Sequence, residues 1–169
     1  LDVDTYKGLT YRNYGDHIEI IDCDETQESV VIPEEINGIP VTAIGDEAFK
    51  DCTKLTSIIT VGFYDITSIG RGAFENCESL GFIVLPFEID KISADMFKGC
   101  KYLNYIYFEG TVKTIEADAF SGCEILRNIY YGGREEFWGD VKIEDGNDAF
   151  KNAAVNFGYN PFSCISDGG

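Results

Sequence analysis

The chain has 169 residues, 44% of them hydrophobic and 25% charged, with a formal net charge of −17 at pH 7. This length suits a single domain or one modest repeat array. A surface this acidic repels phosphate backbones and anionic headgroups, so nucleic acids and membrane surfaces are poor partners. No apolar run approaches the roughly 20 residues that a membrane-spanning helix needs, and we expect no membrane insertion. The opening residues LDVDTYKG show neither the basic nor the apolar region of a signal peptide.

Residues 1–26 predict an N-terminal cap. The segment GLTYRNYGDHIEIIDCDE, residues 8–25, contains two short strand patterns around the turn NYGD, which is typical of a hairpin. A cap is expected here because the residues that follow form a repeat array, and an open array exposes an apolar cross-section at each end.

Residues 27–153 repeat with a period near 23 residues. Phenylalanine recurs in one phase, at Phe49, Phe74, Phe97, Phe120 and Phe150. A cysteine follows the first four at a constant offset of three residues, at Cys52, Cys77, Cys100 and Cys123. In the fifth unit the same offset falls on Ala153. Constant offsets indicate that each of these positions occupies the same place in every unit of the fold.

The other half of each unit has the pattern L-x-x-I-x-apolar, starting at Leu55, Leu80, Leu103 and Leu126, with a degenerate copy at residues 29–33. The first, fourth and sixth positions then face inward, as in a half-buried strand. A unit of this length cannot bury its own apolar face, whereas stacked coils can. The sequence therefore predicts a solenoid of about five coils, with parallel strands about 4.8 Å apart on one face. Segments such as GDEAF are too short for a normal helix and predict single α or 3₁₀ turns on the opposite side.

These units carry a family resemblance. The segment INGIPVTAIGDEAFKDCTKLTSI resembles the BspA-like leucine-rich repeats, whose signature is I-G-x-x-A-F-x-x-C. Departures are minor: Met96 replaces Ala, Ser93 and Glu116 replace Gly, and Ala153 replaces Cys. The resemblance implies an α/β leucine-rich-repeat solenoid, a right-handed superhelix capped at both ends within one domain of residues 1–169. It also implies a bacterial protein, secreted or displayed on the cell surface, that acts in adhesion and is not an enzyme.

The cysteines allow several interpretations. Zinc and redox sites need clustered ligands such as C-x-x-C, which the sequence lacks, and His17 is the only histidine. Equivalent Cβ atoms in adjacent coils would lie about 4.8 Å apart, which is longer than the roughly 3.8 Å of a disulfide. We therefore predict that the four repeat cysteines form a buried column of free thiols. Cys23 fits the head of this column and Cys164 lies outside the repeat, and each is left open as free or bridged.

The end of the chain predicts a second cap. Residues 134–140, REEFWGD, predict a helical turn in the longer fifth unit, and Trp138 is expected to pack in this cap rather than to bind a ligand. The segment AAVNFGY alternates as a final strand, so residues 154–169 are interpreted as a cap strand and tail. Acidic segments such as EDGND do not fit the spacing of a calcium loop, and we expect no metal or cofactor.

The third and fifth positions of the strand pattern must point outward. They bring together an apolar patch of Ile59, Phe82, Val84, Tyr105, Tyr107 and Tyr130. A contiguous exposed patch is typical of a binding surface, and we interpret this one as the site for a protein partner from a host or another cell surface. Three alternatives remain: rings that only stack on one another, a carbohydrate-binding face, and a structural spacer for other domains. We expect a monomer without catalytic residues.

Overall fold

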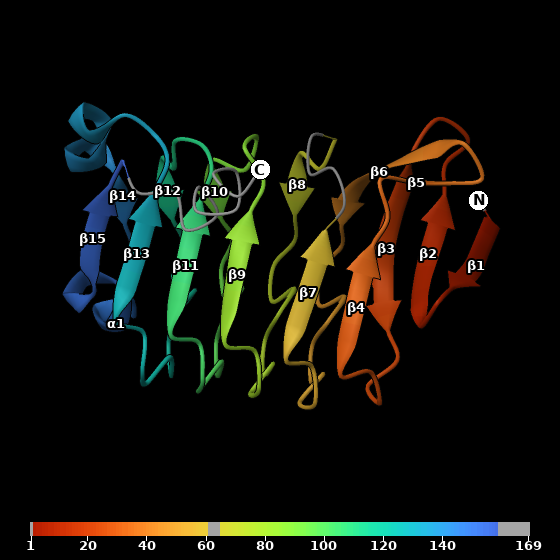
Figure 1. Cartoon of the computed structure of the whole chain (residues 1–169), viewed down its shortest axis with the longest axis horizontal. Coiled ribbons are helices and arrows are strands. Elements are labelled where there is room, and N and C mark those ends of the chain that lie inside the picture. Colours follow the sequence, from red (N-terminus) through yellow and green to blue (C-terminus); the bar gives the residue numbers. More distant parts are fainter. Residues whose placement is uncertain (1, 61–64, 159–169) are drawn as a thin grey trace, which may run out of the picture.

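Each sequence unit folds into one turn of a β-solenoid, and successive turns lie side by side along the long axis of the molecule (Figure 1). The computed structural model describes residues 2–60 and 65–158. One strand from each turn lies on the same side of the molecule, which we call the strand face. In chain order the strands of this face are β4 (Ser29–Ile32), β7 (Ser57–Thr60), β9 (Phe82–Leu85), β11 (Tyr105–Phe108), β13 (Asn128–Tyr131) and β15 (Ala154–Phe157).

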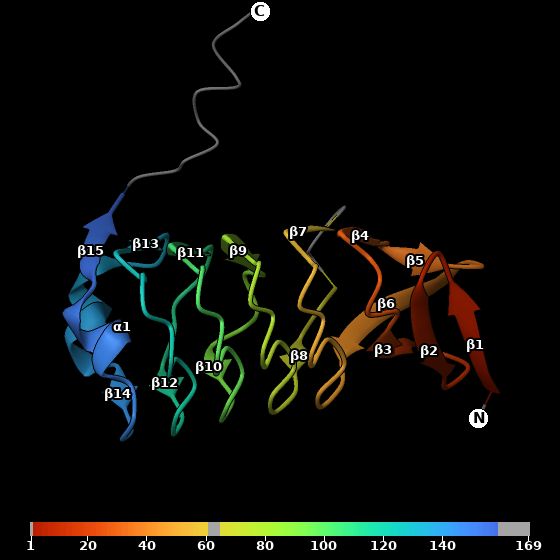
Figure 2. The ribbon, with the colours of Figure 1, turned by 90° about the horizontal axis from the view of Figure 1, so that it is seen from below.

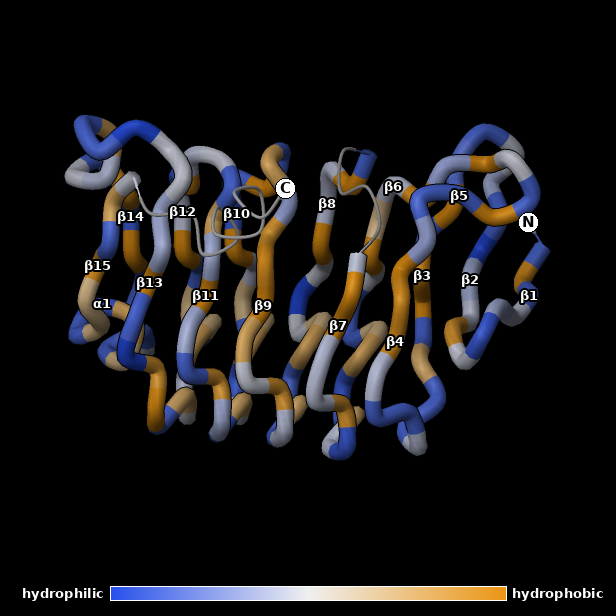
Figure 3. Tube along the Cα trace, in the orientation of Figure 1, coloured by the Kyte–Doolittle hydropathy of each residue, from blue (hydrophilic) through white to orange (hydrophobic). Residues whose placement is uncertain are grey.

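A second row of strands, most of them only two residues long, lies opposite the strand face, on what we call the second face (Figure 2). These strands are β6 (Ile39–Ile44), β8 (Ser68–Ile69), β10 (Lys91–Ile92), β12 (Thr114–Ile115) and β14 (Lys142–Ile143). Apolar segments recur in successive coils (Figure 3), as the sequence period requires. The core fills the space between the two faces, because the inward positions of both rows are apolar.

Neighbouring coils pair in parallel and in register. On the strand face β9, β11, β13 and β15 form one sheet, in which Ile83, Ile106, Ile129 and Val155 are consecutive partners. This confirms the predicted parallel strands. In-register parallel pairing stacks identical positions of the repeat on one another, so one inward isoleucine per coil becomes a continuous apolar column.

Both sheets are interrupted at the same boundary between coils. Within the described residues, β7 pairs with β4 but not with β9, and β8 pairs with β6 but not with β10. At this boundary the Oγ of Ser93 donates a hydrogen bond to the carbonyl of Ile69 at 2.9 Å. In other coils a backbone N–H fills that role, as when Gly70 donates to Ile44 and Glu116 donates to Ile92. The hydroxyl of Ser93 thus supplies a bond between coils where strand pairing is missing.

The corners between the second face and the next strand contain single turns closed by bonds three residues back, the bond type of the predicted 3₁₀ turns, and these turns do not extend into helices. In the corner at residues 45–52, alternate backbone N–H groups bond in two directions. Those of Ala48, Lys50 and Cys52 bond three residues back within the coil, whereas those of residues 47, 49 and 51 bond to carbonyls of the next coil. Glu47 and Asp51 have φ of 56° and 63°, which is the left-handed region. A left-handed residue ends each helical turn, so only the last coil keeps an α-helix.

This corner pattern repeats in the next three coils. Their left-handed pairs are Gly72 with Asn76, Asp95 with Gly99, and Asp118 with Gly122. Bonds between corners join every neighbouring pair of these coils, including the pair at which both sheets are interrupted. The corners therefore form a third continuous connection along the array, besides the two rows of strands.

The N-terminal cap contains the predicted hairpin and one strand more. Its strands β1, β2 and β3 pair antiparallel, and β5 pairs antiparallel with β6. Their bounds are β1 (Asp2–Tyr6), β2 (Leu9–Asn13), β3 (Ile18–Cys23) and β5 (Glu35–Ile36). Because β3 also pairs in parallel with β6, the segment ending in Cys23 already forms a turn of the solenoid. The array has about six turns rather than the five coils predicted.

The C-terminal end is covered by the 3₁₀ helix η1 (Glu135–Asp140) and the short helix α1 (Asp148–Asn152). Trp138 of η1 lies with its ring centroid 4.9 Å from that of Tyr131 and 6.0 Å from that of Phe150. This confirms the helical turn at residues 134–140 and the packing role predicted for Trp138. Cys164 and most of the predicted tail lie outside the described residues.

The side chain of Asn147 ends the corner connection at this cap. It is fully buried, and its Oδ1 accepts the backbone N–H of Phe120 at 3.0 Å. Its Nδ2 donates to the carbonyls of Glu116 and Glu144, each at 2.9 Å. One amide side chain thus satisfies one donor and two acceptors where α1 replaces the repeating corner.

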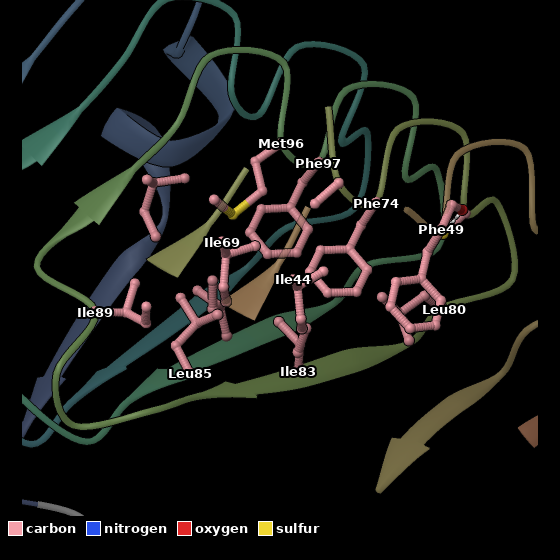
Figure 4. Close-up of a cluster of buried hydrophobic side chains, with 14 of the residues drawn as sticks. Ile44, Phe49, Ile69, Phe74, Leu80, Ile83, Leu85, Ile89, Met96 and Phe97 are labelled. Atoms are coloured by element: carbon pink, nitrogen blue, oxygen red, sulfur yellow. Dashed lines mark hydrogen bonds between the residues drawn. The ribbon is translucent and has the colours of Figure 1, made fainter. Parts of the chain in front are cut away.

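The phenylalanine column forms the centre of the core (Figure 4). Successive rings stack with centroids 5.3 Å apart for Phe49 and Phe74, 5.4 Å for Phe74 and Phe97, and 5.3 Å for Phe97 and Phe120. Phe150 ends the column 4.8 Å from Phe120. All five rings are at most 1% exposed, so each stabilises its coil by burial and by contact with the coils beside it.

Candidate binding surface on the strand face

The strand face places the predicted patch in two columns of outward positions. Register pairs Phe82 with Tyr105 in the first column, and Val84 with Tyr107 and Tyr130 in the second. Ile59 lies in the second column on β7 and is paired with Val31 of β4. The structure therefore brings these six predicted residues to one face, in the order in which their coils stack.

The aromatic side chains of the patch contact one another. The rings of Phe82 and Tyr105 stack with centroids 5.2 Å apart and planes 10° apart. Tyr130 meets Tyr105 edge-on, at 5.6 Å between centroids. All three side chains are partly exposed. Stacking between coils is thus one role of these rings, and it leaves part of each ring accessible to a ligand.

Tyr107 differs from the expectation of an exposed side chain. It is 8% exposed, because it lies on a central strand between Val84 and Tyr130. Burial, with a smaller effect from the carboxylate of Glu109, raises the pKa of its phenol. Burial also raises the pKa of the Glu109 carboxyl. Tyr107 therefore supports its neighbours more than it offers surface of its own.

The most exposed apolar part of the face is the Val31–Ile59 pair. These aliphatic side chains are 45% and 50% exposed and are register partners on β4 and β7. Ser29 and Ser57 lie beside them, with a hydrogen bond of 3.0 Å between their hydroxyls. The sheet interruption separates this pair from the aromatic part of the patch, so the candidate surface has an aliphatic and an aromatic region.

The repeat cysteines lie away from the strand face, in a buried column. Cys52, Cys77, Cys100 and Cys123 are free and at most 1% exposed, and Cys23 is free and 3% exposed. The Sγ atoms of Cys77, Cys100 and Cys123 each lie 3.1 Å from the carbonyl oxygen of the phenylalanine in the preceding coil. Burial raises the pKa of the Cys123 thiol to about 12 and also raises that of Cys100. A protonated thiol is therefore a hydrogen-bond donor between coils, not a nucleophile.

The comparison with known families agrees with this architecture. A family model described as "BspA type Leucine rich repeat region" matches residues 23–155 in six copies. The chain belongs to the BspA-type leucine-rich repeat family. Six copies also agree with about six turns of the solenoid. No curated protein matches this BspA-type repeat protein.

Solved structures share the fold. The leucine rich repeat protein of T. pallidum (TpLRR) superposes with a TM-score of 0.69 at 23% identity, covering 93% of this chain and 82% of its own. A leucine rich cell surface protein from Faecalibacterium prausnitzii A2-165 has a TM-score of 0.61 at 25% identity, covering 85% and 43%. A leucine-rich repeat protein from Bacteroides ovatus ATCC 8483 has a TM-score of 0.53 at 25% identity, covering 77% and 36%. The chain thus spans less than half of the last two proteins.

Two features of this BspA-type repeat protein escape analysis of its sequence. The bond from each of Cys77, Cys100 and Cys123 to a phenylalanine carbonyl cannot be read from the sequence, although the constant Phe–Cys offset of three is its signal. The capping role of Asn147 likewise has no repeat to reveal it, although this amide stands directly before Asp148 and the last A-F pair. Among the described residues no group of three or more His, Cys, Asp or Glu is placed to hold a metal ion. No helix in the same residues is both long and apolar enough to cross a membrane.

Proposed function

We propose that this BspA-type repeat protein is a non-enzymatic binding module that a bacterium secretes or displays on its cell surface. Its strand face holds a protein partner. The observation that carries the proposal is the grouping of apolar side chains on one face: the register pair Val31–Ile59 and, across the sheet interruption, the partly exposed rings of Phe82, Tyr105 and Tyr130. Single exposed apolar residues are ordinary on protein surfaces, whereas a contiguous group favours an interface.

The chemistry of the patch also suits a protein partner. Tyrosine combines a large apolar ring with a polar hydroxyl, and such residues dominate the binding energy of many interfaces. The rings are already ordered by contact with one another, so little side-chain entropy is lost on binding. The cell-surface description of the Faecalibacterium prausnitzii protein supports the location that we propose.

The buried state of the thiols supports a role without catalysis. A cysteine nucleophile needs an accessible thiolate, but burial keeps Cys77, Cys100 and Cys123 protonated. The single histidine, His17, lies on an exposed turn with its Nδ1 2.6 Å from Asp16 Oδ1. The strand face is therefore a stronger candidate site than the thiols or His17.

The test measures binding to immobilised extracellular matrix proteins with two strand-face variants. Val31→Ser/Ile59→Ser and Tyr105→Ser/Tyr130→Ser each remove one region of the patch. Tyr102→Ser is the matched control, because Tyr102 is 63% exposed and precedes the strand rather than lying on the face. We expect at least one matrix protein to bind, both double variants to weaken it about tenfold or more, and the control to leave it unchanged.

The alternatives give different results. Binding that disappears when the glycans of the matrix protein are removed would assign the strand face to carbohydrate, because planar rings also stack on sugars. Binding that both double variants leave intact would refute the strand-face proposal. Absence of binding to every protein tested would favour a spacer that displays other domains. A loss of folding in the tyrosine variant, seen by circular dichroism, would mean that the rings serve only to stabilise the sheet.

A further inference from the structure

A polar groove of about 1350 Å³ lies on the second face, opposite the proposed partner face. One wall comes from the N-terminal hairpin of β2 and β3, and the other comes from β10 with the residues beside it and from Glu116, which follows β12. The floor consists largely of small residues of β6, β8 and the corners, including Ala43, Gly45, Ser68, Gly70 and Ser93. The groove therefore crosses the sheet interruption between β8 and β10, and both parts of the array line it.

The hairpin wall carries a fixed aromatic platform. The rings of Tyr14 and His17 stack in parallel, with centroids 4.6 Å apart and planes 2° apart. The hydroxyl of Tyr14 donates to Glu19 Oε2 at 2.9 Å. Glu19 itself lies over Gly45, since a Cβ added there would come within 2.4 Å of Glu19 Oε1. The absence of a side chain at position 45 thus gives Glu19 its place, and Glu19 orients Tyr14.

The remaining lining offers charged donors held by carboxylates. Arg71 donates through Nη2 to Asp95 Oδ2 at 2.9 Å, and its side chain is 71% exposed. Lys91 Nζ lies 3.5 Å from Glu116 Oε1, and its side chain is 58% exposed. Both cations retain donors that can turn to a ligand. Asp90 and Glu19 add acceptors, so the groove presents both kinds of hydrogen-bonding group.

This combination selects a class of ligand. An extended peptide is held best by apolar pockets, but of the four isoleucines that line the groove only Ile21 is partly exposed, whereas Ile44, Ile69 and Ile89 are buried. Anionic polymers are disfavoured by the net charge of −17. Sugar hydroxyls both donate and accept hydrogen bonds, and the face of a sugar ring packs on an aromatic ring. We propose that this groove binds a linear, uncharged polysaccharide chain.

The site is separate from the strand face, so the two proposals fail independently. Lys91→Ala removes a donor of the groove wall, and Ser68→Trp fills the groove from its floor, where Ser68 is exposed on β8. Lys142→Ala is the matched control. Lys91 is the register partner of Thr114, which is in turn the register partner of Lys142, so the two lysines occupy equivalent positions two strands apart. Lys142 is also exposed and close to a glutamate, but it does not line the groove.

The assay is native gel electrophoresis through gels that contain mixed-linkage β-glucan, xylan, glucomannan, amylopectin or dextran. We expect at least one polysaccharide to retard the wild-type protein. Lys91→Ala should weaken that binding about tenfold, Ser68→Trp should abolish it, and Lys142→Ala and Tyr105→Ser/Tyr130→Ser should leave it unchanged. Circular dichroism checks that each variant is folded.

Three outcomes would overturn the proposal. One is that none of the five polysaccharides retards the wild-type protein. Another is retardation that persists in both groove variants. If only the strand-face variant removes that retardation, sugar binding belongs to the strand face. The third is groove-dependent binding of an unfolded polypeptide, reduced and carboxymethylated α-lactalbumin, without any polysaccharide binding.

Discussion

Replacing Asn147 by alanine should loosen the C-terminal end of the array. The substitution removes an acceptor for the N–H of Phe120 and donors to the carbonyls of Glu116 and Glu144, with bonds of 3.0, 2.9 and 2.9 Å. The position is fully buried, so water cannot readily replace the lost amide. The N–H of Phe120 and the carbonyl of Glu144 would lose the bonds that Asn147 makes, and the carbonyl of Glu116 would keep only its longer bond of 3.3 Å from the N–H of Ala119.

The size of the effect follows from these bonds. Each intramolecular hydrogen bond contributes about 1 kcal/mol net, so the three together give about 3 kcal/mol. For a chain of this length each kcal/mol corresponds to roughly 2–4 °C, and the melting temperature should fall by about 6–12 °C. Asn152→Ala is the control, because Asn152 is exposed at the end of α1 and its replacement should change the unfolding free energy by less than about 0.5 kcal/mol.

Equilibrium unfolding in urea, followed by two probes, measures this effect. Trp138 is the only tryptophan of the chain and packs on Tyr131 and Phe150, so its fluorescence reports on the last coil. Far-ultraviolet circular dichroism reports on the whole array. Because coils interact only with their neighbours, we expect the fluorescence midpoint to shift more than the dichroism midpoint. If Asn147→Ala shifts neither midpoint more than Asn152→Ala does, the capping role of Asn147 is refuted.

Three further predictions concern the coil contacts. Burial raises the pKa of the Cys123 thiol to about 12, above its unfolded value near 9.0, so unfolding between these pH values releases a proton. The unfolding free energy measured in urea should therefore fall as pH rises from 9 towards 12. The buried thiols of the folded protein should not react with Ellman's reagent at pH 8. Gly70→Ala places a Cβ 2.4 Å from a backbone nitrogen and should destabilise by about 2 kcal/mol or more, whereas Gly81→Ala, with nothing within 4 Å, should be neutral or slightly stabilising by urea unfolding. Ser93→Ala should lower the unfolding free energy by about 1–2 kcal/mol in the same assay, because it removes the bond at the sheet interruption. Ser57→Ala, which removes an exposed bond between hydroxyls, is the control, and an equal loss from both variants would contradict a special role for Ser93.

The columns of the core could be predicted because they depend only on spacing. When Phe49 and Cys52 recur at a constant offset, stacked coils must place like residues on like, and the parallel register follows. The inward direction of Ile83 and Leu85 follows from the alternation of side chains along a strand. These inferences need no knowledge of distant contacts, since every coil meets a near copy of itself.

The corner conformation could not be predicted from local preference. Acidic residues such as Glu47 and Asp95 suit the start of a helical turn, yet both adopt left-handed backbone angles. Bonds to the neighbouring coil accompany that conformation, so tertiary contact outweighs propensity. A signal does exist one residue before each repeat cysteine, where Asp51, Asn76 and then two glycines are residue types that tolerate φ above zero.

The sequence predicts which side chains of the strand face point outward, but not how much of each side chain is exposed to solvent. Alternation places Tyr107 on the outer side of its strand, but its neighbours across the sheet determine that it is 8% exposed. The groove of the second face depends on the hairpin that carries Tyr14 lying across the groove from Lys91, which is far along the sequence. No periodic pattern encodes that proximity, because the hairpin lies outside the repeat.

The sheet interruption also determines how the molecule should respond to force. Bonds between coils run along the long axis, so a pull on the two ends places the same load on every boundary between coils. In the described residues, the boundary between β7 and β9 holds corner bonds and the hydroxyl of Ser93 but no strand pairing. Under tension the array should part there first, which would open the groove floor while both blocks keep their sheets. For a protein anchored at a surface, such a boundary would act as an extensible joint.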